Sequence, residues 1–282
     1  MRGCEIGRQR GDANALPRRR ELGVVVKLRS DRPLVNLLAD RFREFWREPG
    51  VVFWTFGFPI MLAVVLSLAF REKATETVDA AHPTRRYVDF LMPGLVGMTL
   101  LNGGAWGVGF GLILMRTRKL LKRLAATPMH RADLLLAFVL FRVLLSLIET
   151  GVLLGLGALL FSTRIGGSIV DLTLIVVLAG LSFAGLGLLC ASRAQNPQTG
   201  NGWVNLATLP MFLVSGVFFE SRNFPDWLKP WIEALPLTAC NDALRAIVQE
   251  GKSIAEVVPQ CGVLALWGGV TFTIALRVFR WT

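Results

Sequence analysis

Six long apolar stretches divide this chain of 282 residues, and they restrict its possible folds more than any other feature. They cover residues 51–70, 88–115, 134–161, 172–191, 203–219 and 262–278. Most are close to the ~20 residues that a helix needs to cross the ~30 Å hydrocarbon core of a bilayer. No water reaches that core to satisfy backbone amides, so such segments must be helical. The sequence therefore predicts an all-α, polytopic membrane protein with six transmembrane helices.

The basic residues between the stretches predict the orientation in the membrane. The segments 1–50, 115–133, 192–202 and the C-terminal tail hold 21 Lys and Arg residues, whereas the intervening segments hold nine. By the positive-inside bias, the first set and both termini are predicted to be cytoplasmic. The net charge of +11 lies almost entirely on that side. It indicates anionic lipid headgroups or an acidic subunit as partners, and not nucleic acid.

The N-terminal region is predicted to combine a basic tail with a surface helix. Residues 1–33 are expected to be a cytoplasmic tail without regular structure. Within 34–48, apolar residues recur at spacings of three and four with charged residues between them. This pattern is typical of an amphipathic helix at the cytoplasmic interface; a helix packed on another subunit is the alternative. Pro49 and Gly50 then allow the chain to turn into the membrane.

The sequence offers almost none of the polar constellations that an enzyme needs. His82 and His130 are predicted to lie on opposite sides of the membrane, so one chain cannot combine them in a triad or a metal site. The Gly-Lys-Ser sequence at 251–253 is similar to the end of a nucleotide-binding loop. The required earlier glycine is replaced by Ala246, however, and no strand precedes the segment. We therefore predict no catalytic, metal or cofactor site in this chain.

Polar and aromatic side chains inside the second and third spans are candidate functional residues. Asn102 and Trp106 flank a glycine stripe that is expected to serve close backbone packing, and they are expected either to pack or to line a path. The stripe consists of Gly103, Gly107 and Gly111. Arg142 and Glu149 lie two helical turns apart on one face of the third span. A charge at the bilayer centre costs on the order of 3 kcal/mol, so they are predicted to pair or to line a water-filled path.

Two connecting segments carry recognisable patterns. From 116 to 128 the chain is basic with leucines on one side, which predicts a short cytoplasmic helix that ends at Pro128. Attachment to the membrane surface alone would explain its charge. The long outer segment after the fifth span is too apolar for a solvated loop, so short helices folded into the outer leaflet are expected. Cys240 and Cys261 share this outer segment, where a disulfide and two free thiols are the alternatives.

These patterns resemble the transmembrane subunit of type-2 ABC exporters over about residues 34–280. The fifth-span and outer-loop signature of that family is similar to Ser215, Gly216, Phe218, Phe219, Pro225, Trp227, Pro236, Leu237 and Thr238. Its cytoplasmic motif is similar to Arg118, Leu120, Leu121, Lys122, Arg123, Leu124, Thr127 and Pro128, although the family often has an acidic residue and a glycine where this chain has Lys119 and Leu120. Within the family, the pattern is closer to the drug and antibiotic group than to the polysaccharide group.

The resemblance implies partners and a function that composition does not reveal. Such permeases have six spans per half, pair as homodimers or heterodimers in the cell membrane, here the bacterial inner membrane, and form the export path between the halves. A separate ATP-binding cassette subunit, which binds ATP and Mg, docks against the cytoplasmic helix and the N-terminal helix. Residues 34–282 would then be one exporter domain that moves a drug, a lipid-like molecule or a glycan outward. An ion-coupled transporter or channel, and a membrane scaffold without transport, are the alternatives.

Overall fold

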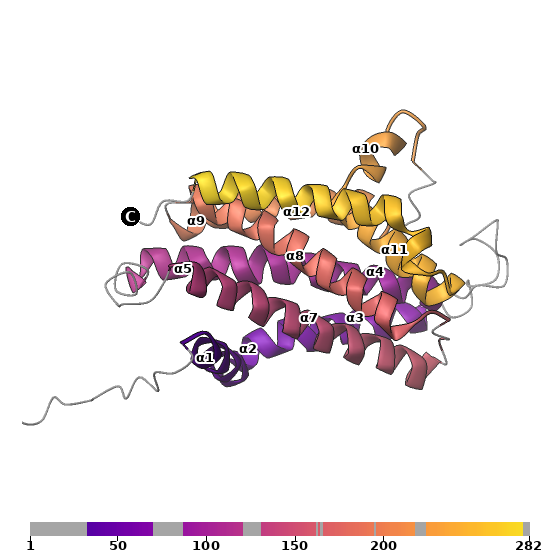
Figure 1. Ribbon diagram of the computed structural model, residues 1–282. Helices are drawn as coiled ribbons and strands as arrows, with labels where there is room; N and C mark the ends of the chain where they lie inside the picture. The colour runs from indigo at the N-terminus through magenta and orange to yellow at the C-terminus, as the bar shows by residue number, and fades with distance from the viewer. Residues whose placement is uncertain are drawn as a thin grey trace, which may run out of the picture. The chain divides into compact units, whose positions relative to one another are not determined.

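The computed structural model describes residues 33–69, 87–120, 131–161, 163, 166–194, 196–217 and 224–278 (Figure 1). Helices dominate these ranges, and no strand occurs among them. The predicted all-α class is therefore confirmed for this part of the chain. Apart from Pro33, the predicted N-terminal tail lies outside the described residues.

The helices follow one another along the chain in the order that the apolar stretches predict. The first group is α1 (Pro33–Arg47), α2 (Pro49–Val52), η1 (Phe53–Gly57), α3 (Phe58–Ala69), α4 (Tyr87–Asn102), η2 (Gly103–Phe110) and α5 (Gly111–Thr117). The second group is α7 (Arg131–Phe161), α8 (Ile169–Arg193), α9 (Pro197–Val214), α10 (Lys229–Glu233), α11 (Pro236–Glu250), η4 (Ile254–Glu256) and α12 (Val258–Val278). The segments η1 and η2 have π-helical hydrogen bonding, and each continues the helices on either side of it.

Five helical stretches of the described residues are long and apolar enough to cross a membrane. They are Pro49–Ala69, Val88–Thr117, Leu135–Phe161, Ile169–Arg193 and Val258–Val278. Each corresponds to one of the six predicted spans, so the chain is a multi-pass membrane protein. The count of six stays a prediction, because α9 is not among the five.

The helix α9 differs in position from the predicted fifth span, 203–219. It begins at Pro197, because the Asn196 side chain accepts a hydrogen bond of 2.7 Å from the Thr199 amide and caps its N-terminus. It ends at Val214, shortly before Gly216 adopts a positive φ of 74°. The helix therefore includes a polar first half and stops before Phe218, and this composition lowers its hydropathy.

The core of the bundle is built around α4 and α8. The largest fully buried side chains include Leu91, Leu95, Ile175 and Phe183 of these two helices. The helix α8 also packs against η2 and α12. Small residues let α8 and η2 come together, since a Cβ on Gly187 would lie only 2.1 Å from the carbonyl oxygen of Gly104. A side chain at either glycine would force these two helices apart.

The helix α1 runs across the direction of the long helices and is seen nearly end-on in Figure 1. It packs against α7 and α2. The continuous α4–η2–α5 rod and the long helices α7, α8 and α12 lie roughly along one direction in the same view. A crosswise amphipathic helix beside such a bundle is the arrangement expected of a helix at a membrane surface.

Two hydrogen bonds join the end of the α4–η2–α5 rod to the end of α8. The Arg116 side chain, in the last turn of α5, donates to the carbonyl oxygens of Ala191 and Ala194 at 2.9 Å each. The end of the second predicted span therefore lies beside the end of the fourth. The charge count assigns the segments that follow both spans to the same side of the membrane, and this contact agrees with that assignment.

Candidate functional site

A cavity of about 1150 Å³ lies between α1, the α2–η1–α3 rod, the α4–η2–α5 rod and α7. Aromatic side chains from all four of these parts line it, among them Phe45, Trp54, Phe58, Trp106 and Phe141. Its volume is at or above the upper end of the ~300–1,000 Å³ that is usual for small-molecule sites. The cavity is therefore large enough for a ligand of drug or lipid-fragment size.

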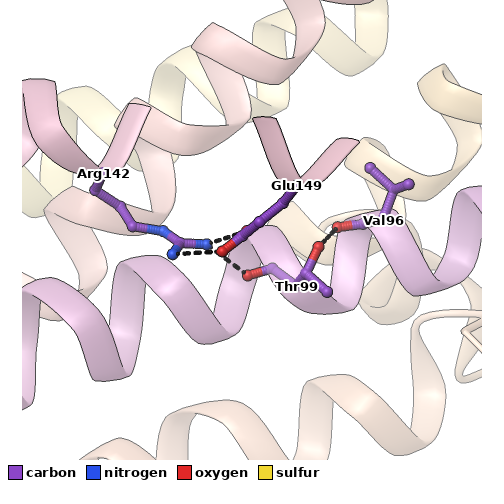
Figure 2. Close-up of polar contacts among 4 residues, drawn as sticks. All are labelled: Val96, Thr99, Arg142 and Glu149. Atoms are coloured by element: carbon purple, nitrogen blue, oxygen red, sulfur yellow. Dashed lines mark hydrogen bonds and ion pairs between the residues drawn. The ribbon is translucent and has the colours of Figure 1, made fainter. Parts of the chain in front are cut away.

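A buried ion pair forms part of the cavity wall (Figure 2). Arg142 donates to the two carboxylate oxygens of Glu149, from Nη1 at 2.9 Å and from Nη2 at 2.5 Å. The same Nη2 also donates to the carbonyl oxygen of Thr99 on α4 at 3.1 Å. Arg142 is 5% exposed and Glu149 is 1% exposed. The two charges satisfy each other inside the protein and do not face lipid.

The helix α7 positions both charges, and a glycine on η2 makes room for them. Arg142 and Glu149 are seven residues apart, about two turns of α7, so the long Arg142 side chain extends along one helix face to reach the carboxylate. A Cβ on Gly103 would lie only 1.5 Å from Arg142 Cζ. Gly103 is the first residue of η2. The π-helical segment therefore begins where the Arg142 guanidinium group packs against the second span.

The structure brings together the four residues that the sequence singled out inside the spans. Asn102, Trp106, Arg142 and Glu149 all line the same cavity. The Trp106 ring packs against Phe110 with a centroid distance of 5.4 Å. Arg142 and Glu149 form an ion pair, which was one of the two predicted alternatives. Their position in the cavity wall is also compatible with the other alternative, that they line a water-filled path. Whether any of the four contacts a transported molecule stays a prediction.

The glycine stripe of the second span has a different use from the expected one. Gly103 and Gly107 face the Arg142 side chain, and Gly111 faces the Phe138 ring, where a Cβ would lie 3.4 Å from it. These glycines make room for side chains of α7. Close backbone contact is made instead by the next face of the same helix, through Gly104 and Gly109 against α8.

The helix α1 forms one wall of the cavity. Arg41 lies over the Phe138 ring at 4.0 Å and forms an ion pair of 2.7 Å with Glu44. Burial lowers the pKa of Arg41 below its ordinary value, and the Glu44 carboxylate opposes this shift. Phe42 meets Phe141 edge to face at 4.9 Å. The amphipathic pattern contains Phe42 on its apolar side but did not predict these contacts.

Both π-helical segments face this cavity. Trp54 and Thr55 of η1 line one wall, and Trp106 and Val108 of η2 line another. π-Helical turns inside α-helices are rare and frequently occur at functional sites. Their presence on two walls of one cavity supports a functional role for it.

The outer-loop signature forms a separate packed unit. The Asn241 amide donates to the carbonyl oxygen of Ser215 at 2.8 Å, and Arg245 donates to the carbonyl oxygen of Gly216. The signature residues Pro236, Leu237 and Thr238 open α11 and are buried. Trp227 is 73% exposed, Pro225 is also exposed, and Phe218 and Phe219 lie outside the described residues. None of the signature residues that the structure describes lines the cavity.

Most of the predicted docking segment lies outside the described residues. Arg118 and Leu120 are described, whereas Leu121, Lys122, Arg123, Leu124, Thr127 and Pro128 are not. The helix α5 continues through Thr117, and Lys119 then adopts a positive φ of 57°. Arg116 therefore belongs to the span and not to the predicted cytoplasmic helix.

Two further expectations concern Cys240, Cys261 and metal binding. Cys240 and Cys261 are free thiols. The structure therefore agrees with two free thiols and not with a disulfide between them. Burial and the nearby Asp242 carboxylate raise the pKa of the Cys240 thiol. Within the described ranges, no group of three or more His, Cys, Asp and Glu side chains is placed to hold a metal ion.

Several permeases are similar to this chain. It is 25% identical over 158 residues to the linearmycin resistance permease protein LnrN of Bacillus subtilis, covering 56% of this chain and 41% of that protein. It is 23% identical to the probable multidrug ABC transporter permease YbhR of Escherichia coli, covering 71% and 54%. It is 25% identical to the probable doxorubicin resistance ABC transporter permease protein DrrC of Mycobacterium tuberculosis, covering 85% and 84%. The chain thus spans about half the length of the first two relatives and most of the third.

The family comparison covers most of the fold described above. Residues 34–248 match the ABC-2 type transporter family. The matched range begins in α1 and ends in α11, so it includes every element that lines the cavity and both partners of the outer-loop contacts. The chain therefore belongs to the ABC-2 type transporter family.

Proposed function

We propose that the chain is the membrane-spanning permease subunit of an ATP-driven ABC exporter. It moves a hydrophobic or amphipathic substrate, such as a drug, a lipid-like molecule or a glycan, out of the cytoplasm or the inner leaflet. In this proposal it lies in the bacterial inner membrane with both termini in the cytoplasm. A separate ATP-binding cassette subunit binds ATP and Mg, and a second permease copy or a paralogue completes the transporter.

The cavity carries this proposal. Its walls are mainly aromatic and aliphatic, and its charged groups lie in the ion pair and on the α1 side. Apolar walls with a few placed polar groups are typical of sites for small amphipathic molecules. The names of the relatives agree with this class of substrate, since two of them refer to resistance against linearmycin and doxorubicin and one to multidrug transport.

Export by the reconstituted complex tests the proposal. The chain is co-purified with its ATP-binding partner and placed in vesicles, and the ATP-dependent movement of fluorescent amphipathic drugs is measured. Trp106→Ala removes a large part of one cavity wall and is expected to lower export. Trp203→Ala is the matched control, because Trp203 lies on α9 and does not line the cavity. Equal export by both variants and by the unmodified complex would remove the cavity from the transport path.

The docking of the ATP-binding subunit is a further part of the proposal. Leu124 belongs to the leucine side of the basic segment 116–128, which resembles the family's cytoplasmic motif. We expect Leu124→Asp to release the partner or to uncouple ATP hydrolysis from export, because an apolar contact would acquire a buried charge. Membrane insertion should be unaffected. Intact co-purification together with normal export would refute this docking role.

An ion-coupled transporter or channel is the second candidate function. One observation favours it: the Glu149 carboxylate lies inside a membrane span and forms part of a cavity wall. Ionisable groups at such positions commonly mark proton or ion pathways. Vesicles that contain the chain without an ATP-binding subunit decide between the two candidates. Movement of substrate down an imposed proton or sodium gradient would favour this second function, and movement only with the ATP-binding subunit and ATP would favour the exporter.

A further inference from the structure

The charged groups of the cavity compensate one another. Three arginines and three glutamates line it: Arg41, Arg47, Arg142, Glu44, Glu48 and Glu149. Arg41 pairs with Glu44 on α1, and Arg142 pairs with Glu149 on α7. The cavity thus has no formal net charge, and both its partly buried and its fully buried arginine already have a carboxylate partner. A ligand that carried its own net charge would find no uncompensated opposite charge inside.

Two polar groups of the wall nevertheless lack partners. Nε of Arg142 has no hydrogen-bond partner, but it has almost no exposed surface and lies against Gly103, so it does not face the cavity. The half-buried Asn102 side chain lines the cavity and has no hydrogen-bond partner among the described residues. A polar group in a mostly apolar cavity is stabilised when it gains a hydrogen-bond partner. The Asn102 amide can therefore donate to an acceptor on a ligand.

We propose that this cavity binds, within a single chain, an amphiphile whose polar head carries no net charge. Its head accepts a hydrogen bond from the Asn102 amide, and its apolar part lies against Trp54, Phe58 and Trp106. The charge balance disfavours a charged head, the Asn102 amide favours a head with oxygen acceptors, and the aromatic walls favour an apolar tail. The inference builds on the proposed permease function, because it names the class of molecule that the permease would bind.

A glycine in the wall allows the cavity to be filled without disturbing the ion pair. Gly107 lines the cavity, and a Cβ there would meet only Arg142 Cδ, at an ordinary distance of 3.6 Å. Gly107→Leu therefore places an isobutyl group in the cavity. Gly151→Leu is the matched control, since Gly151 lies on α7 outside the cavity and a Cβ there would meet nothing within 4 Å.

The test uses three photoreactive amphiphiles that share one diazirine-bearing hexadecyl chain. Their heads are a glucoside without charge, a trimethylammonium cation and a sulfate anion. The complete transporter complex in phosphatidylcholine nanodiscs is irradiated without ATP at equal membrane concentrations of each probe. Labelled peptides from η1 and η2 are then quantified by mass spectrometry.

We expect the glucoside probe to label the η1 and η2 peptides about tenfold more than either charged probe, which corresponds to a difference of ~1.4 kcal/mol in binding. An excess of unlabelled alkyl glucoside should compete for this labelling, Gly107→Leu should abolish it, and Gly151→Leu should retain it. Equal labelling by all three probes, preference for a charged probe, or unchanged labelling of Gly107→Leu would each overturn the inference.

Export measured on the same preparation separates this inference from the proposed function. ATP-dependent movement of the glucoside probe without labelling of the cavity would overturn the site and leave the exporter standing. Labelling without ATP-dependent movement of any probe would support the site and count against the exporter. Where the site is labelled and export occurs, Gly107→Leu identifies the occupant. Loss of both binding and export indicates a transported molecule, and loss of binding alone indicates a resident bilayer lipid.

Discussion

The Arg142–Glu149 pair is the most buried ion pair among the described residues, with side-chain exposures of 6% and 1%. Removing two charges from water is costly, and the bidentate geometry together with the Thr99 carbonyl oxygen offsets much of this cost. The balance depends on both partners being present. An isolated Arg142 or Glu149 in this place would be an uncompensated charge inside a membrane span.

Glu149→Gln should therefore destabilise the protein. The substitution keeps the size of the side chain but leaves the Arg142 charge without its counterion, and we expect a loss of about 3 kcal/mol in the free energy of unfolding. Adding Arg142→Gln should recover part of this loss, because the remaining charge is then removed. Thermal unfolding of the purified complex measures both effects.

The control for this prediction is the exposed partner of the other cavity pair. Glu44 is 60% exposed, and an exposed ion pair contributes about 0–1 kcal/mol, so Glu44→Gln should change the unfolding temperature little. An effect of Glu44→Gln as large as that of Glu149→Gln would show that burial does not determine the strength of the pair. Failure of the double variant to recover stability would show that Glu149 acts through other contacts.

Gly103 and Gly107 provide a second comparison between neighbouring residues. A Cβ on Gly103 would overlap the Arg142 guanidinium group, whereas a Cβ on Gly107 would make an ordinary contact. Gly103→Ala should lower the yield of folded protein and its unfolding temperature, because the ion pair or the second span must move. Gly107→Ala should be tolerated. Size-exclusion profiles and unfolding curves of the two variants check this expectation, and equal behaviour would contradict it.

The helix α11 holds the end of the fifth predicted span in place. Its Asn241 side chain packs over Gly97 of α4, where a Cβ would lie 1.9 Å from Asn241 Oδ1. Its amide group binds the Ser215 carbonyl oxygen, just before the backbone turns at Gly216 with a positive φ. Arg245, one turn further along α11, lies over the Phe90 ring at 4.0 Å. The outer-loop signature is thus explained, for its described residues, by packing between three helices.

Asn241→Ala should loosen this junction. The Ser215 carbonyl oxygen would lose its buried donor, and we expect a loss of about 1–3 kcal/mol in the free energy of unfolding. Asn201→Ala on α9 is a suitable control, because Asn201 is exposed and its side chain accepts a hydrogen bond of 2.6 Å from the Asn205 amide in the next turn of the same helix. Limited proteolysis between α9 and α10, measured beside thermal unfolding, would detect the loosened turn. Similar behaviour of the two variants would argue against the role assigned to Asn241.

The elements also differ in how readily the sequence reveals their ends. Asn196 and Pro197 are a cap and a first-turn residue, and both are visible in the sequence as a helix start. The apolar window nevertheless placed the fifth span six residues later, because hydropathy reports contact with lipid and not hydrogen bonding at a helix end. Lys119 with its positive φ is a different case, since no local signal predicts a lysine in that conformation.

The orientation of the whole molecule follows from its charge distribution and is open to a direct test. Reporter fusions at Lys122 and at the C-terminus should both report a cytoplasmic location, and a fusion near Lys229 at the start of α10 should report an external one. The contact between the ends of α5 and α8 requires only that the segments following these helices share a side. An external signal at Lys122 would invert the predicted topology.

The sequence by itself determined the helical class, the five described spans and the amphipathic α1. These features depend on the hydropathy of consecutive residues and on the helical period, and both are local properties. The spacing of seven residues between Arg142 and Glu149 likewise predicted a shared helix face. Four residues of the cavity wall could therefore be predicted from the sequence, because polar and ionisable side chains inside an apolar span are conspicuous.

Only the tertiary structure decided how those residues are used. It placed Asn102 and Trp106 in the same wall as the ion pair, and it assigned the glycine contacts to Gly104 and Gly187 and not to the stripe that begins at Gly103. The cavity itself arises between four separate parts of the chain, and Arg41 of α1 contacts Phe138 of α7 in its wall. Such features depend on which helix faces meet, and the local pattern of one helix does not contain that information.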